Sequence, residues 1–151
     1  MGCYVGADLT GYNAIKLLIK GKGKNSGSLI FELYDDDNKN WALELFPKYP
    51  SQPRFDDRFV YTQKVTWSGW RVVIIPFSYF SDLNPSVGDN KWNPDQADGS
   101  GGLLQMQMIL MAANAKSAPD ISIDFVKFIA MPADVVPEPK NPEVPEFVEW
   151  W

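Results

Sequence analysis

Histidine is absent from this chain of 151 residues, and cysteine occurs once, at Cys3. Without histidine the chain cannot form a Ser-His-Asp triad, a Cys-His pair or a histidine metal site. A single cysteine excludes an internal disulfide and a thiolate cluster. No apolar run approaches the ~20 residues that a membrane-spanning helix needs. These absences remove the catalytic and metal-binding arrangements that depend on histidine or on pairs of cysteines.

Positive charge is scarce and scattered. The formal net charge is −5, and the isoelectric point is about 4.7. Binding to a phosphate backbone needs clustered lysine and arginine. The one basic cluster, Lys20, Lys22 and Lys24, lies in a glycine-rich turn, where a solvated loop is the ordinary interpretation. We therefore expect neither a nucleic acid nor a membrane as partner.

Helical periodicity is also missing, and apolar residues recur at every second position. Turn-forming residues separate these short alternating segments, a pattern typical of an antiparallel sandwich. The segments cover residues 15–20, 29–34, 41–46, 59–65, 70–75, 104–111 and 121–129. The sequence predicts an all-β antiparallel β-sandwich, with a single helical turn within residues 77–83.

The composition changes after Ala130, where proline and glutamate begin to alternate. This pattern predicts an extended tail or linker over residues 131–151, after a folded domain over residues 1–130. The terminal Phe147, Trp150 and Trp151 are unusual for a solvated linker, and they dock either on the domain or on a partner. Because the chain opens almost directly into a strand, we expect an upstream segment or a partner chain to complete the sheet. The protein would then be part of a larger multidomain protein.

Aromatic residues are abundant, with six Trp, six Tyr and nine Phe. A chain of this size cannot easily bury them all. Trp41 and Trp70 share the phase of the apolar residues in their predicted strands, so we expect both in the core. Trp92 lies in a polar loop over residues 84–102, where burial and a ligand-binding role are equally open. Tyr61 and Trp67 leave the same two alternatives.

Several short motifs follow one another in a recognisable order over residues 8–130. They are residues 8–12 (DLTGY), 20–23 (KGKG), 35–37 (DDD) followed by Trp41, 69–71 (GWR), 75–80 (IPFSYF) and 121–128 (ISIDFVKF). This succession resembles the family-eleven carbohydrate-binding modules, which are galactose-binding-like jelly rolls. The resemblance implies that a concave sheet binds a polysaccharide of the β-glucan type without catalysis. It also implies an extracellular or cell-surface location.

The resemblance implies roles for particular residues. Asp37, four residues before Trp41, resembles a sugar-contacting aspartate of the family. Asp124 matches an acidic position on the family's last strand, which helps to hold a structural calcium ion. The chain departs from the family at Ala112, which stands where the family presents a stacking tyrosine. One aromatic platform is therefore missing.

Recognition of a sugar requires flat rings that stack on its C–H face and planar polar groups that bind its hydroxyls. If Leu104, Met106, Met108 and Leu110 face the core, Gln105 and Gln107 point to the opposite face. Solvated polar positions are the alternative for both glutamines. The arginines offer further donors, although surface ion pairs are their more common fate. The candidate ligand-binding residues are Asp37, Tyr61, Trp67, Arg71, Trp92, Gln105 and Gln107.

Two other classes of function are alternatives to sugar binding. A glycosidase needs two carboxylates ~5 to 9.5 Å apart in a cleft, and nothing in the sequence pairs two carboxylates in this way, so we expect no enzyme.

The acidic turn at residues 35–38 lacks the spacing of a calcium-binding loop and predicts a plain β-turn. The alternative function is a structural or assembly subunit, such as a surface-layer or flagellar-sheath protein or a complex-assembly factor. The incomplete sheet edge, the Pro/Glu tail and Ala112 favour that alternative.

Overall fold

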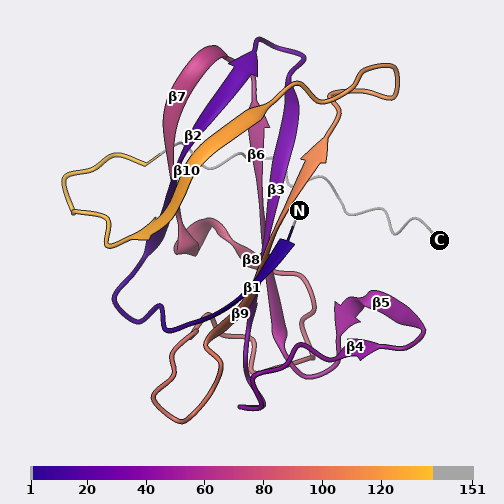
Figure 1. Cartoon of the computed structure of the whole chain (residues 1–151), viewed down its shortest axis with the longest axis vertical. Helices are drawn as coiled ribbons and strands as arrows, with labels where there is room; N and C mark the ends of the chain where they lie inside the picture. Colours follow the sequence, from indigo (N-terminus) through magenta and orange to yellow (C-terminus); the bar gives the residue numbers. More distant parts are fainter. Residues whose placement is uncertain (1, 138–151) are drawn as a thin grey trace.

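Two antiparallel sheets pack face to face in the computed structural model, which describes residues 2–137 (Figure 1). The five-stranded sheet has the order β1 (Gly2–Ala7), β9 (Leu103–Met111), β3 (Gly27–Asp35), β6 (Asp57–Val65) and β8 (Ser81–Asp82). The three-stranded sheet has the order β10 (Ser122–Ile129), β2 (Ala14–Lys22) and β7 (Ser68–Pro76). A hairpin of β4 (Leu45–Phe46) and β5 (Tyr49–Pro53) projects from the side of the sandwich (Figure 1). The predicted all-β sandwich is confirmed.

The predicted strands at residues 15–20, 29–34, 59–65, 70–75, 104–111 and 121–129 are confirmed as β2, β3, β6, β7, β9 and β10. The predicted helical turn is a 3-10 turn at Phe77–Tyr79. The tail residues Phe147, Trp150 and Trp151 lie outside the described residues. No helix within residues 2–137 is long and apolar enough to cross a membrane.

The core forms because alternate residues of each strand point between the sheets. Phe31 and Leu33 of β3 are fully buried there, and they meet Leu17 and Ile19 of β2 in one apolar cluster. The residues between them in sequence, such as Glu32 and Tyr34, point to the outer face of the five-stranded sheet. The two faces of this sheet therefore carry different chemistry.

Two tryptophans lie outside the core, contrary to the prediction. Trp70 is 51% exposed because β7 carries apolar residues in both phases, and its pairing with β2 directs Val73 and Ile75 inward instead. Trp41 is 47% exposed. The predicted strand at residues 41–46 was wrong over most of its length: only Leu45 and Phe46 form a strand, and Trp41 has a φ angle of +63°, outside the extended region.

Candidate functional site

A groove of about 250 Å³ lies on the outer face of the five-stranded sheet, bounded by the hairpin segment. The sheet contributes five polar lining residues, Glu32, Tyr34, Arg58, Gln105 and Gln107. Ser51 of the hairpin also lines the groove, and Leu43, Leu45 and Ile109 add apolar walls. The five polar residues of the sheet come from the adjacent strands β3, β6 and β9, which are rigid elements of the fold. The groove thus combines planar polar groups with apolar surface.

Strand register brings these polar side chains onto one face. Tyr34 of β3 lies opposite Arg58 of β6 and opposite Gln105 of β9. Glu32, two residues earlier, lies opposite Gln107. Residues directly opposite one another in neighbouring strands point to the same face of a sheet. The register therefore determines the composition of the groove.

A buried ion pair forms the floor of the groove. Arg58 Nη2 lies 2.5 Å from Glu32 Oε1, and the side chains are 9% and 2% exposed respectively. The Tyr34 hydroxyl donates to the other Glu32 oxygen at 2.7 Å. Burial, followed by the charge of Glu32, raises the pKa of Tyr34, which keeps this hydroxyl a donor. Arg58 also donates to the Ser51 carbonyl at 3.3 Å, which ties the hairpin to the sheet.

Gln105 and Gln107 lie where strand alternation predicts them. Both are half-buried in the groove, while Met106 and Met108 pair with core positions of β3 and contact the core. Leu110 departs from the prediction, because it lies exposed near the end of β9. The two amides remain candidate ligand-binding groups.

Tyr61 does not reach the outer face. It lies opposite Phe31, shares that residue's inward direction and is 3% exposed. Its ring packs beside Tyr79 and Phe80 at centroid distances of 5.9 and 5.7 Å. Tyr61 is therefore a core residue, and its prediction as a ligand-binding residue was wrong.

Trp67 and Arg71 lie together near the hairpin turn between β6 and β7. The Trp67 indole packs partly against the core and donates to the Ile19 carbonyl at 3.2 Å. The Arg71 guanidinium stacks over this ring, 5.1 Å from its centroid. Arg71 belongs to β7, in the opposite sheet from the groove. The structure does not bring either residue to the groove.

Trp92 packs edge-on against Phe59 and Phe77, at centroid distances of 5.3 and 5.0 Å. It also lines a depression of about 400 Å³ with Leu9, Asn13 and Asn93. Both asparagines of this depression form hydrogen bonds within the fold: Asn13 accepts from the Met131 amide, and Asn93 donates to Asp89. We therefore favour the groove as the ligand site, although the depression is larger.

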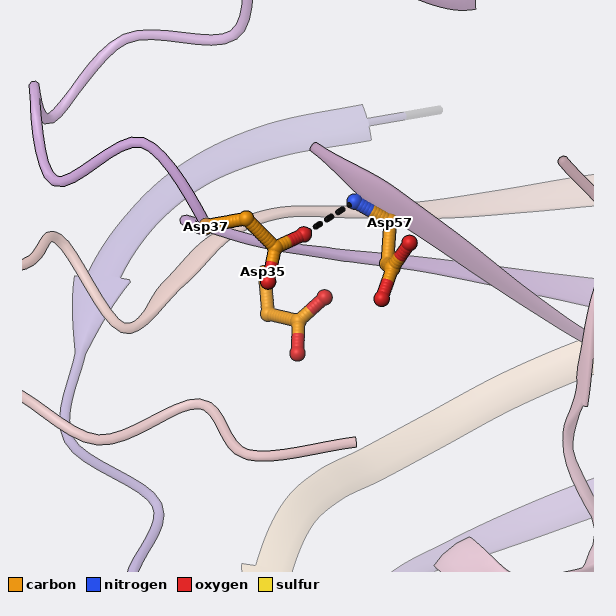
Figure 2. Close-up of side chains that lie close together, drawn as sticks. All are labelled: Asp35, Asp37 and Asp57. Atoms are coloured by element: carbon orange, nitrogen blue, oxygen red, sulfur yellow. Dashed lines mark hydrogen bonds between the residues drawn. The ribbon is translucent and has the colours of Figure 1, made fainter. Parts of the chain in front are cut away.

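Asp37 belongs to a group of three carboxylates at the ends of β3 and β6, which we call the carboxylate cluster: Asp35, Asp37 and Asp57. One carboxylate oxygen from each residue lies within 4.8 Å of the other two. Figure 2 shows the three side chains directed toward one another, with Asp37 Oδ2 accepting from the Asp57 amide at 2.8 Å. The structure therefore brings Asp37 to a different place from the groove residues Gln105 and Gln107.

The electrostatics of the carboxylate cluster are unfavourable to ionised carboxylates. Burial, followed by the charge of Asp37, raises the pKa of Asp35 to about 9. Burial and the charge of Asp57 raise the pKa of Asp37 to about 7. Burial and the charge of Asp82 raise the pKa of Asp57 to about 6. Desolvation and like charge both favour the protonated form of an acid.

Asp124, the residue implied for structural calcium, lies exposed on β10. Its Oδ1 accepts from the amide of Phe125, at a bulge where β10 loses register with β2. Among the described residues it does not belong to the group of carboxylates that the structure brings together. A calcium role for Asp124 stays a prediction.

Sequence reasoning missed Glu32, Tyr34 and Asp57, and it interpreted the acidic segment 35–38 as a plain β-turn, whereas Asp35 is the last residue of β3. A glutamate within the apolar segment 29–34 was one available signal, because a charged residue in a buried strand needs a partner. For the arginines, Arg58 among them, the sequence left open a donor to a ligand or a surface ion pair, and Arg58 instead lies in the buried pair with Glu32. Glu32 and Arg58 form this pair because β3 lies beside β6 in the sheet.

Comparison with known proteins finds no matching family model, no similar curated protein and no similar solved structure. The resemblance to the family-eleven carbohydrate-binding modules therefore stays a prediction.

Proposed function

We propose that this protein binds a polysaccharide, a chain of the β-glucan type, in the groove on the outer face of the five-stranded sheet, without catalysis. One observation carries the proposal: Gln105 and Gln107 present planar amide groups on one rigid sheet face, beside an apolar wall. Amide side chains both donate and accept, as a sugar hydroxyl does. An extracellular or cell-surface location and membership of a larger protein belong to the same proposal.

Charge supports a neutral ligand. The Glu32 carboxylate and the Arg58 guanidinium neutralise each other at the floor of the groove. A charged ligand group would have to compete with this buried pair, whose disruption is costly. A neutral chain of hydroxyls meets the two amides without disturbing the pair.

Aromatic surface lies on the hairpin beside the groove. Phe46 of β4 pairs with Tyr49 of β5, and their neighbours Leu45 and Pro50 line the groove. Phe46 is exposed. Its ring offers a flat apolar face of the kind on which sugar rings stack. We propose the hairpin rings as stacking platforms in place of the tyrosine that Ala112 replaces.

Glu32 is the single carboxylate among the described residues that line the groove. Most glycosidases use a pair of carboxylates on either side of the scissile bond. Glu32 is also engaged by Arg58 and by Tyr34. These features support binding without hydrolysis.

The test replaces the two amides. We expect Gln107→Ala and Gln105→Ala each to weaken binding about tenfold, because each loses hydrogen bonds worth ~1 to 1.5 kcal/mol. Affinity electrophoresis against β-glucans, xyloglucan and mannan selects the polysaccharide, and isothermal titration calorimetry measures the affinity. No retardation by any polysaccharide, with an intact fold by circular dichroism, would count against the proposal.

Arg71→Ala is the control variant, because Arg71 lies in the opposite sheet. Its affinity should equal that of the unchanged protein. Binding that survives both glutamine substitutions but is lost in Arg71→Ala would move the site away from the groove.

The outer face of the three-stranded sheet favours a second candidate function, a structural or assembly subunit. Trp70 and Val72 of β7 and Phe125 of β10 are exposed there. Exposed apolar side chains that lie near one another are typical of protein interfaces. Size-exclusion chromatography with light scattering separates the candidates: ordered assembly without sugar binding favours the second, and a monomer that binds glucan favours the first.

A further inference from the structure

We propose that the carboxylate cluster of Asp35, Asp37 and Asp57 binds one divalent cation, and that its donor set favours Ca²⁺. The cluster lies at the end of the sandwich, where β3 ends at Asp35 and β6 begins at the opposite residue Asp57 (Figure 2). This site is separate from Asp124 and does not depend on the ligand of the groove.

Two buried oxygens of the cluster have no partner within the described part of the chain. Asp35 is 1% exposed and Asp57 is 0% exposed. Each uses its Oδ2 to accept a backbone amide of the loop before β9, from Asn93 at 3.2 Å and from Lys91 at 3.0 Å. The Oδ1 atom of each has no hydrogen-bond partner. A buried, unpaired carboxylate oxygen is costly unless a cation or a proton satisfies it.

Asp36, between two members of the cluster, shows what a structural aspartate looks like in this fold. Its Oδ2 accepts the amides of Trp41 and Gly101, and its Oδ1 accepts the amide of Asn40. Both of its oxygens are therefore used by backbone donors. Asp56, which is 0% exposed, likewise has one oxygen without a hydrogen-bond partner among the described residues, its Oδ2. The unpaired carboxylate oxygens are therefore found at the end of β3 and the start of β6, next to a fully bonded aspartate.

The spacing of the cluster suits one ion. One oxygen from each of the three residues lies within 4.8 Å of the others. Calcium binds oxygens at about 2.3 to 2.6 Å, so two ligands on opposite sides of one ion are about 4.6 to 5.2 Å apart. All three carboxylates can therefore contact the same ion.

The donor set determines the class of metal. Carboxylate and carbonyl oxygens suit Ca²⁺, Mg²⁺ and Mn²⁺, whereas zinc and copper sites use thiolate and imidazole. Several protein carboxylates on one ion are typical of Ca²⁺, because Mg²⁺ retains most of its water. The remaining positions of a Ca²⁺ ion would be filled by loop carbonyls or by water.

The loop backbone closes over the same oxygens. A Cβ atom at Gly88 would overlap Asp57 Oδ1 and Asp37 Oδ2, and Gly88 has a φ angle of +67°. Only a residue without a side chain lets the loop approach the cluster this closely. The ion would thus join the ends of β3 and β6 to the loop that carries Trp92.

Charge repulsion within the cluster also favours a cation. One oxygen of each of the three carboxylates lies within 4.8 Å of the others, and like charges at this distance repel one another. A divalent cation bound between the carboxylates removes that repulsion.

The experiment uses the full chain after dialysis against EDTA. Adding millimolar CaCl₂ should raise Tm by roughly 5 to 15 °C, because an ion that binds only the folded state stabilises it. Tb³⁺ should bind and luminesce on excitation of tryptophan, since Trp92 adjoins Asn93, whose amide contacts Asp35. A chain that shows neither the shift in Tm nor Tb³⁺ luminescence overturns the proposal.

Asp35→Asn and Asp57→Asn should abolish the shift in Tm, while Asp124→Asn, an exposed control, should retain it. If the buried variants fail to fold, Asp37→Asn provides the same measurement at a half-buried position. Loss of the shift in Asp124→Asn, with retention in the cluster variants, would place the ion at β10 and overturn the proposal. Each readout is independent of polysaccharide, so failure here leaves the proposed function of the groove unaffected.

Discussion

Strands β3 and β6 bury acidic side chains on both faces of the sheet, and the two faces treat the negative charge differently. On the outer face Glu32 is paired with Arg58 and accepts a hydrogen bond from Tyr34. On the inner face, at the end of the same strands, Asp35 and Asp57 each retain an oxygen without a partner. A basic side chain completes one site, whereas we propose that the other is completed by a cation from solution.

The two sites differ by one position along each strand. Tyr34 lies opposite Arg58 on the outer face, and the next pair, Asp35 and Asp57, lies on the inner face. Because successive residues of a strand point to opposite faces, the groove and the carboxylate cluster lie back to back. A change at one site can therefore be compared with a change at the other on the same backbone.

The largest effect should follow from removing the base. Arg58→Ala leaves Glu32 buried without its counter-charge, and we expect a loss of about 3 to 5 kcal/mol in the free energy of unfolding. Denaturation in urea measures this change. Arg54→Ala is the control, because Arg54 is exposed and only stacks on Phe55 and Phe46. Equal losses in the free energy of unfolding in the two variants would show that the buried Glu32–Arg58 pair stabilises the fold no more than an exposed arginine does.

The carboxylate cluster should make the stability of the protein depend on pH. The folded-state pKa values of Asp57 and Asp37, about 6 and about 7, lie above the ordinary aspartate value of 3.8. Folding therefore favours their protonated forms, so in EDTA this stabilisation is complete below about pH 4 and is lost as the pH rises through 6 and 7. We expect a loss of about 2 kcal/mol or more, because one pKa unit corresponds to about 1.4 kcal/mol.

Urea denaturation at several pH values measures this dependence, with and without CaCl₂. The fall in stability should be smaller with Ca²⁺, because the ion compensates the ionised carboxylates. Asp35→Asn with Asp57→Asn should flatten the profile in EDTA. A profile that rises between pH 5 and 7 in EDTA would contradict the assignment.

The smallest effect should come from the loop. Gly88→Ala places a methyl group against two cluster oxygens at a φ angle of +67°, and we expect a loss of about 1 to 2 kcal/mol in EDTA. The variant should also lose most of its Ca²⁺-dependent rise in Tm. Gly99→Ala is the matched control, because Gly99 has a φ angle of +78° but no atom within 4 Å of its added Cβ. A rise in Tm with Ca²⁺ as large in Gly88→Ala as in the unchanged protein would show that the loop does not contribute to ion binding at the carboxylate cluster.

Alternation in the sequence was sufficient for most of the fold and for part of the groove. It located β2, β3, β6, β7, β9 and β10, and it placed Gln105 and Gln107 away from the core. Both results follow from one local rule, that neighbouring side chains of a strand point to opposite faces. The rule failed at Trp70, because β7 is apolar in both phases and only pairing with β2 determines its inward face.

The sites themselves depended on contacts between residues far apart in the chain. Glu32 meets Arg58, and Asp35 meets Asp57, only because β3 and β6 pair in one particular register. Tyr61 and Trp92 are likewise placed by core packing against rings from other segments.

From the sequence alone follow an all-β sandwich, a composition poor in basic side chains and without histidine, and the outward direction of two glutamines. These depend on residue type and on local periodicity. The tertiary structure decided which acids lie together, which one has an arginine and which tryptophans are buried. Strand register and the packing of two sheets set these distances, because no local property of the chain specifies which distant residues become neighbours.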